Sequence, residues 1–269
     1  MMSIPALSGF LLGLTMIIAA VFMNTDDVMI FFHLEAVMIV IGGTVACSFM
    51  SFQHTYVIIG FKAIWWMVKK PKSTREGLNT DILRLIKWAY LVQQKGLPAL
   101  EAEIRSVPTN DPVMKYCLEL VASAHKPEEL RVMMETAVES EYERKVVPVT
   151  VLKTMAANAP SFGLIGTLVG LIAMLKGMGG GGDDMFRVVG SGMATALTAT
   201  LYGIFTARMI YLPAANQLQQ NEEIERLRNH MILDGLVMLA EKKGPRFMQD
   251  RLNSFLDPAI HFNIDKQIR

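Results

Sequence analysis

Four long apolar stretches, separated by polar segments, dominate the pattern of hydrophobic and polar positions along the chain. Residues 4–23 and 154–175 contain no charged side chain, and the other two stretches run from about residue 28 or 34 to 52 and from 188 to 207. A helix that rises about 1.5 Å per residue needs about 20 residues to cross the hydrocarbon core of a bilayer. The pattern therefore predicts an all-α membrane protein with four transmembrane helices in contact with lipid.

A polar segment of roughly a hundred residues follows the second stretch and extends from residue 53 to 150. Its basic side chains gather just beyond that stretch, at Lys62, Lys69, Lys70, Lys72 and Arg75. Because Lys and Arg near the ends of spans favour the cytoplasmic side, we expect this loop and both termini to be cytoplasmic. Apolar residues in the loop recur at the spacing of a helix, at Leu78, Ile82, Leu85, Ala89, Leu130, Met133, Met134 and Ala137. This spacing predicts a helical cytoplasmic domain.

The tail after the fourth stretch is polar but keeps a helical pattern. Ile224, Leu227 and Met231 repeat at helical spacing, Gly244-Pro245 ends that pattern, and residues 247–256 are expected to form one more short helix. The sequence thus divides into transmembrane spans one and two at 1–52, a cytoplasmic helical loop domain at 53–150, spans three and four at 151–212, and a cytoplasmic helical tail at 213–269.

The third and fourth stretches each carry a stripe of small residues. On the third, Gly163, Gly166, Thr167 and Gly170 share one side of a helix. The stripe on the fourth consists of Gly192, Ala196, Ala199 and Gly203. Small residues let membrane helices approach each other closely, so each stripe is expected to pack against another helix. Pro160 removes a backbone donor, and we expect it to break the third span and to free a carbonyl.

The middles of these two stretches contain no Asp, Glu, His or Lys. Cation transport normally needs an ionisable group that binds and releases the ion, so a conducting complex requires a second chain that supplies the carboxylate. This chain offers oxygen atoms instead, from Thr167, Thr200 and the carbonyl near Pro160, and such ligands suit a hard cation such as sodium. A threonine in a membrane helix also commonly bonds a carbonyl of its own helix, and this alternative stays open.

Composition and charge exclude several other classes of protein. The chain is 52% hydrophobic and 19% charged, with a mean hydropathy of +0.33 and a formal net charge of +1. The two cysteines, Cys47 and Cys117, suggest no disulfide framework, and the five histidines show no metal-ligand spacing. No set of nucleophile, base and oxyanion donor is visible. The sequence therefore predicts no enzyme, no resident metal or cofactor, and no nucleic-acid partner.

Three further features have ordinary interpretations. Glu35 lies at the expected start of the second span, where an interfacial position is favoured over an intramembrane one. The glycines at 179–182 lack the Lys-Ser/Thr of a phosphate-binding loop and predict a flexible link. The charges at Glu135, Glu139, Glu141 and Glu143 are interpreted as a solvated helix face.

Several segments resemble the MotA/PomA family of flagellar stator subunits, and the resemblance extends over nearly the whole chain. They are residues 159–175, 196–204, 213–216 and 234–235, with 42–44 and 96–101. The resemblance implies a ring of five copies around two single-span helices of a MotB/PomB-type partner in the bacterial inner membrane. The partner's aspartate would carry the transported Na⁺ or H⁺, and its periplasmic domain would hold the cell wall.

The resemblance also implies roles for particular residues. Pro160 and Pro213 stand where the family has prolines that couple ion passage to movement of the cytoplasmic part. Thr167 and Thr200, beside Gly163, stand on the ion pathway where sodium-driven members have threonines. Proton-driven members usually have a small apolar residue at the Thr167 position. Sodium is therefore expected as the coupling ion.

The contact with a FliG-type rotor protein is expected in the cytoplasmic loop. Glu101 matches an acidic family residue at this contact, but the basic residue expected three positions before Gly96 is Gln93, with Lys95 nearby. Two alternatives remain: a related ExbB/TolQ motor subunit that energises the outer membrane, and a scaffold that conducts no ion. ExbB/TolQ proteins usually have three spans, so four spans favour the stator.

Overall fold

The described part of the chain folds into helices joined by short loops and turns. The computed structural model describes residues 4–24, 28–66, 75–100, 111–123, 125–178, 184–256, 258 and 261, and no strand occurs among them. These residues form two units, the first from Met1–Lys70 and Val146–Gln219 and the second from Pro71–Lys145 and Gln220–Arg269. The predicted all-α class is confirmed.

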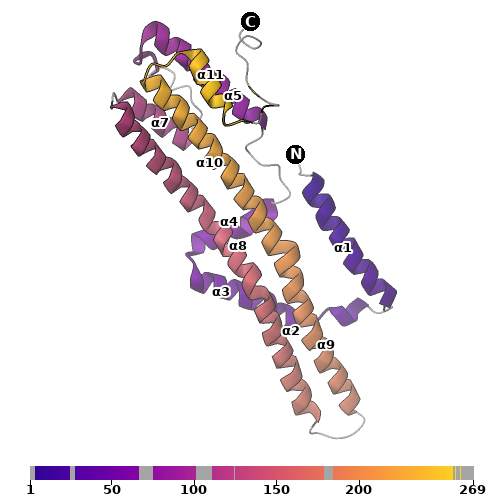
Figure 1. Ribbon diagram of the computed structural model, residues 1–269. Helices are drawn as coiled ribbons and strands as arrows, with labels where there is room; N and C mark the ends of the chain where they lie inside the picture. Colours follow the sequence, from indigo (N-terminus) through magenta and orange to yellow (C-terminus); the bar gives the residue numbers. More distant parts are fainter. Residues whose placement is uncertain are drawn as a thin grey trace. The chain divides into compact units, whose positions relative to one another are not determined.

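The first unit contains the apolar helices. It consists of α1 (Ile4–Asn24), the short 3₁₀ helix η1 (Val28–Phe31), α2 (Leu34–Val37), the π-helix η2 (Met38–Gly42), α3 (Gly43–Ser51), α4 (His54–Trp66), the later part of α8 (Pro127–Met178), α9 (Asp184–Phe205), the π-helix η3 (Thr206–Tyr211) and the start of α10 (Leu212–Ala240). Figure 1 shows α9 running alongside the later part of α8. The α2 segment packs on α9.

Three stretches of the described helices are long and apolar enough to cross a membrane, judged by length and composition alone. They are Met29–Ser51, Pro127–Met178 and Met185–Ala240, and Ser8–Met23 is a shorter apolar helix. Three of the expected spans therefore lie on suitable helices, and the span at residues 4–23 stays a prediction. Residues 25–27, between the first two apolar stretches, and the glycine link at 179–182 lie outside the described residues, as do Lys69, Lys70 and Lys72.

The second unit has its own hydrophobic core. It contains α5 (Arg75–Lys95), α7 (Pro112–Ala122), the first part of α8, the later part of α10 and α11 (Pro245–Asn253), with α11 beside α5 (Figure 1). The helical pattern predicted for the loop is confirmed, because Leu78, Ile82, Leu85 and Ala89 are all buried. The short helix expected after Gly244-Pro245 is also present as α11.

The helix predicted for the tail is present as α10, and its three apolar positions differ in exposure. Met231 is buried, but Ile224 and Leu227 are 38% and 44% exposed, so only the later part of α10 faces the core of the second unit. Helical spacing identifies residues on one side of a helix, but it does not show where along the helix a neighbour ends.

Local sequence explains several helix ends in the second unit. The α5 helix stops where Gly96 adopts a φ of +80°, which favours glycine. Asp111 caps α7, because its carboxylate accepts a hydrogen bond of 3.2 Å from the Met114 amide and Pro112 follows at the first helical position. The first turn of α8 contains Glu128 and Glu129, whose negative charges are favoured at a helix N-terminus.

The α8 helix is continuous over 52 residues, from Pro127 to Met178, with Pro148 and Pro160 inside it. The expected break at Pro160 is therefore wrong. A proline removes one donor, and the hydrogen bonds on either side are sufficient here for the helix to continue. The acidic segment and the third apolar stretch consequently belong to a single helix.

Candidate functional site

The small-residue stripes of α8 and α9 pack against each other, as the sequence predicted for each. A Cβ atom on Gly203 would lie 2.7 Å from the Ala159 carbonyl oxygen, and one on Gly170 would lie 2.9 Å from the Gly192 carbonyl oxygen. Only glycine permits backbones to approach this closely. The two helices therefore form one closely packed pair within the first unit.

Gly163 and Thr200 meet in this pair. A Cβ atom on Gly163 would lie 3.0 Å from the Ala199 carbonyl oxygen and 3.2 Å from the Thr200 Cα. Thr200 is half-buried, and its hydroxyl forms no hydrogen bond within the part of the chain that the structure describes. This hydroxyl is available to a ligand that approaches the helix pair.

Thr167 lies in a different local environment. It is half-buried, and its hydroxyl donates a hydrogen bond of 2.7 Å to the carbonyl of Leu164 on the same helix. The alternative left open by the sequence, a threonine bonded to its own backbone, is therefore realised here. A hydroxyl that donates its proton still has lone pairs, so the Thr167 oxygen can accept a hydrogen bond or coordinate a cation.

Other hydroxyls in the first unit are bonded within their own helices. Thr198 donates to Ala194 at 2.8 Å, Thr206 to Tyr202 at 2.8 Å, and the buried Thr44 to Val40 at 2.6 Å. Such bonds satisfy the hydroxyl without a partner helix. The Thr200 hydroxyl makes no such bond among the described residues, unlike those of Thr198 and Thr206 in the same apolar stretch. This difference was not visible in the sequence.

A tyrosine that sequence reasoning missed connects α9 to η1. The Tyr202 hydroxyl on α9 donates to the carbonyl of Phe31 in η1. Its ring packs against Ala36, Val40 and Ala199. A tyrosine inside an apolar stretch was the available signal, because a buried phenol usually finds a hydrogen-bond partner.

The two candidate coupling prolines occupy different settings. Pro160 is exposed inside α8, and its Cα would lie 3.2 Å from a Cβ atom on Gly203. Pro213 is the second residue of α10 and follows the π-helix Thr206–Tyr211 directly. Single π-helical turns are frequently found at functional sites, and the sequence analysis did not foresee this one.

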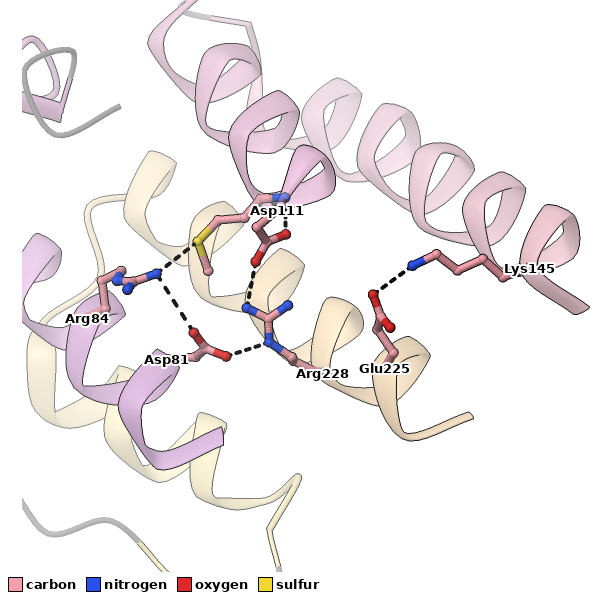
Figure 2. A network of polar contacts seen from close by, with 7 residues as sticks. Asp81, Arg84, Asp111, Lys145, Glu225 and Arg228 are labelled. Atoms are coloured by element: carbon pink, nitrogen blue, oxygen red, sulfur yellow. Dashed lines mark hydrogen bonds and ion pairs between the residues drawn. The ribbon is translucent and has the colours of Figure 1, made fainter. Parts of the chain in front are cut away.

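The charged residues of the second unit are more strongly paired than the sequence indicated. Figure 2 shows Arg228 of α10 between Asp81 of α5 and Asp111 before α7. Its Nε and Nη2 atoms each donate a hydrogen bond of 2.6 Å, to the Asp81 and Asp111 carboxylates respectively. Burial alone would lower the pKa of Arg228, but the hydrogen bonds and negative charges of the two aspartates outweigh it and raise that pKa.

Ion pairs also join α8 to α10. Arg226 donates two hydrogen bonds of 3.0 Å to Glu139, and Lys145 binds Glu225 at 2.7 Å (Figure 2). Glu141 is half-buried, and its pKa is lowered mainly by the hydrogen bond from Arg144. Glu139 and Glu141 of this acidic run therefore form ion pairs with basic residues of α8 and α10, and Glu139 stays 40% exposed while Glu141 is more shielded.

The candidate rotor contacts are only partly visible. Gln93 and Lys95 are exposed near the end of α5, while Glu101 lies outside the described residues. Residues two apart point to different sides of a helix, so Gln93 does not share a face with Lys95. Lys95 lies instead on the same side as Arg84 and Lys87.

No group of three or more His, Cys, Asp or Glu side chains is placed to hold a metal ion among the residues described. Cys47 accepts a hydrogen bond of 3.3 Å from Asn158, and Cys117 is buried, so each packs within its own unit.

Comparison with known proteins gives concordant results. A family model described as the MotA/TolQ/ExbB proton channel family matches residues 107–231. The chain is 30% identical over 238 residues to Motility protein A of Treponema phagedenis, with 88% of each chain covered. It is 27% identical over 268 residues to Motility protein A of Borreliella burgdorferi, with 99% of each covered. Its fold is similar to a chain of the flagellar MotAB stator complex from Bacillus subtilis, with a TM-score of 0.79, 25% identity, and coverage of 94% of this chain and 96% of that one.

The close packing of α8 on α9 predicts a sharp difference between two glycines of α9. Gly203→Ala would place a methyl group 2.7 Å from a backbone carbonyl, whereas Gly190 has nothing within 4 Å of the equivalent position. Overpacking of this kind typically costs about 1–3 kcal/mol. We expect Gly203→Ala to lower the thermal stability of the detergent-purified protein, with Gly190→Ala as the matched control. Equal stability of the two variants would contradict the close contact.

Proposed function

Because this chain belongs to the MotA/TolQ/ExbB family, with motility protein A among its relatives, we propose that it is the ion-conducting stator subunit of a bacterial flagellar motor. Members of this family are channel subunits and not enzymes, in agreement with the sequence analysis. The chain would reside in the bacterial inner membrane with both termini cytoplasmic.

The observation that carries this proposal is the packing of α8 on α9 without an acid in either apolar stretch. Residues 154–175 and 188–207 contain no Asp or Glu, yet the uncommitted Thr200 hydroxyl lies beside Gly163 in the packed pair. A cation needs a group that binds and releases it. A MotB/PomB-type single-span partner would supply that aspartate, as expected for an assembly like the Bacillus subtilis MotAB complex.

In the assembly we propose, five copies of this chain surround the partner's helices. The paired helices α8 and α9 would form the wall of the ion path, and the partner's aspartate would pass along it. The related ExbB/TolQ function is less well supported, because the similar curated proteins reported above are motility proteins.

Sodium is the coupling ion that the oxygen atoms of this pair favour. The Thr200 hydroxyl makes no internal bond, and the Thr167 oxygen retains its acceptor lone pairs after donating to Leu164. A sodium ion sheds part of its water shell on passage, and hydroxyl oxygens replace that water. A proton requires only a carboxylate and a chain of water molecules.

Coupling to the second unit is proposed to involve Pro160 and Pro213. Pro160 lies inside α8 against Gly203, and Pro213 follows the π-helix Thr206–Tyr211. Both sites locally lack regular helical hydrogen bonds, so a small change of helix direction costs less there than elsewhere.

The rotor contact is proposed to use the basic side of α5. Lys87 and Lys95 are exposed and make no ion pair within the described part of the chain, while Arg84 has Asp81 only at 4.0 Å. Asp81 is instead bound closely by Arg228. This side of α5 therefore presents positive charge to an acidic surface of a FliG-type rotor, with Glu101 and Gln93 as the further contacts expected from the family.

The ion assignment predicts that swimming depends on external sodium. We expect Thr200→Ala to raise the sodium concentration for half-maximal speed about tenfold, because loss of one oxygen ligand costs about 1.4 kcal/mol or more. Thr167→Ala should have a smaller effect, and Thr200→Ser should behave as the wild type. The measurement is swimming speed against external sodium at constant proton-motive force. Wild-type speed that is independent of sodium would contradict the assignment.

The rotor proposal predicts an effect of charge reversal on α5. Single exposed charges contribute little, typically about 0–1 kcal/mol, so we reverse Lys87 and Lys95 together to Glu. The double variant should lose torque in tethered cells while its membrane level stays normal. Lys115→Glu with Lys126→Glu is the matched control, because these lysines of the second unit are also exposed and without ion pairs in the described structure. Equal torque in both double variants would exclude this side of α5.

A further inference from the structure

One arginine joins three helices of the second unit. The Arg228 side chain of α10 reaches Asp81 on α5 and Asp111 at the start of α7, each at 2.6 Å (Figure 2). Asp111 also accepts the Met114 amide hydrogen bond that caps α7. We call these three side chains the Arg228 clasp.

The clasp is well shielded from water. The side chains of Arg228, Asp81 and Asp111 are 18%, 8% and 18% exposed, respectively. Removing charges from water is costly, and a buried ion pair is often no more stabilising than an apolar cluster of equal volume. The second unit already has an extensive apolar core, which includes Ile82, Leu118 and Leu236. Stability alone does not explain why these helices meet through three charged groups.

An arginine adds a fixed hydrogen-bond geometry to a contact between helices. A guanidinium is planar and donates hydrogen bonds in a fixed fork, so two carboxylates bound to it are fixed in angle as well as distance. Packing between apolar side chains tolerates small rotations of a helix about its axis. The directional bond from Arg228 to Asp81 limits such rotation of α5, because the same guanidinium is held in place by Asp111. The clasp therefore fixes the rotation of α5 relative to α10.

The rotation of α5 decides where its basic side points. Successive residues of an α-helix are about 100° apart around the axis, and α5 is continuous from Arg75 to Lys95. Asp81 thus sets the direction in which Lys87 and Lys95 project. A rotation of α5 by about 100°, the angle between successive residues, would turn both lysines away from the rotor surface.

We propose that Arg228 is the positioning residue for the rotor-facing side of α5. It acts through Asp81 and Asp111 and touches neither ion nor rotor. This inference rests on the proposed stator function, and it concerns the transmission of force and not the conduction of ions.

The chain offers a close control for this proposal on the same helix. Arg226 also binds a carboxylate through two hydrogen bonds, to Glu139, and its guanidinium lies 4.5 Å from the Tyr142 ring centroid. Both side chains of that pair are 40% exposed, so water can replace the bonds if one partner is removed. Arg226 thus connects α10 to α8, whereas Arg228 connects α10 to α5.

The first experiment compares Arg228→Gln, Arg228→Lys and Arg226→Gln in the full chain, co-expressed with its single-span partner. Both Arg228 variants should lose stall torque while ion flux through the complex is retained, since lysine keeps the charge but lacks the fork. Arg226→Gln should keep both. Full torque with Arg228→Lys, or an equal loss in Arg226→Gln, would overturn the proposal.

A second measurement separates positioning from folding. Nitroxide spin labels are attached at Tyr90→Cys on α5 and Leu227→Cys on α10, both exposed positions of the second unit, with Cys47 replaced by Ala. The distance distribution between the labels should broaden in Arg228→Gln and Arg228→Lys and stay narrow in Arg226→Gln. If Arg228→Gln fails to accumulate, Arg228→Gln with Asp81→Asn and Asp111→Asn removes the unpaired charges and should show the same broadening. An unchanged narrow distribution in the Arg228 variants would refute positioning. Absence of torque and flux in the wild type would instead refute the stator function.

Discussion

The close contact between the α8 and α9 backbones is the constraint on which the rest of the first unit depends. At Gly203 and Gly170 a backbone carbonyl occupies the space that a side chain would need. Such a pair holds together by packing and leaves no room for a carboxylate between its helices. In the proposed stator the ion-binding acid would therefore come from another chain, and the pair would contribute geometry and hydroxyl oxygen.

In the second unit the corresponding constraint is a set of directional hydrogen bonds between charged side chains. Its apolar core holds α5, α7, α8, α10 and α11 together, while Arg228 adds direction through two carboxylates. Both α8 and α10 contribute residues to the two units, so each continues from the apolar helices into the charged ones. We infer that close packing governs ion passage and that directional ion pairs govern the contact with the rotor.

Sequence alone was sufficient to predict features that depend on residue size and spacing. The glycine stripes and the buried positions of α5 follow from local rules about backbone approach and helical period. The Arg228 clasp could not be predicted from the sequence, because Asp81 lies 147 residues before Arg228 and each residue alone resembles a surface charge. The π-helix at Thr206–Tyr211 and the continuity of α8 through Pro160 depend on packing around the helix, which no local pattern encodes. The state of the Thr167 and Thr200 hydroxyls likewise depends on the rotamer that the neighbouring helix permits.

In the proposed stator this chain forms a cation path only together with a partner's carboxylate. This requirement is tested most directly by cation uptake into proteoliposomes that contain this chain alone, the chain with its single-span partner freed of any inhibitory segment, or the chain with that partner's aspartate changed to Asn. We expect uptake only in the second preparation. Equal uptake by the chain alone, or by the complex with the Asn partner, would contradict this requirement.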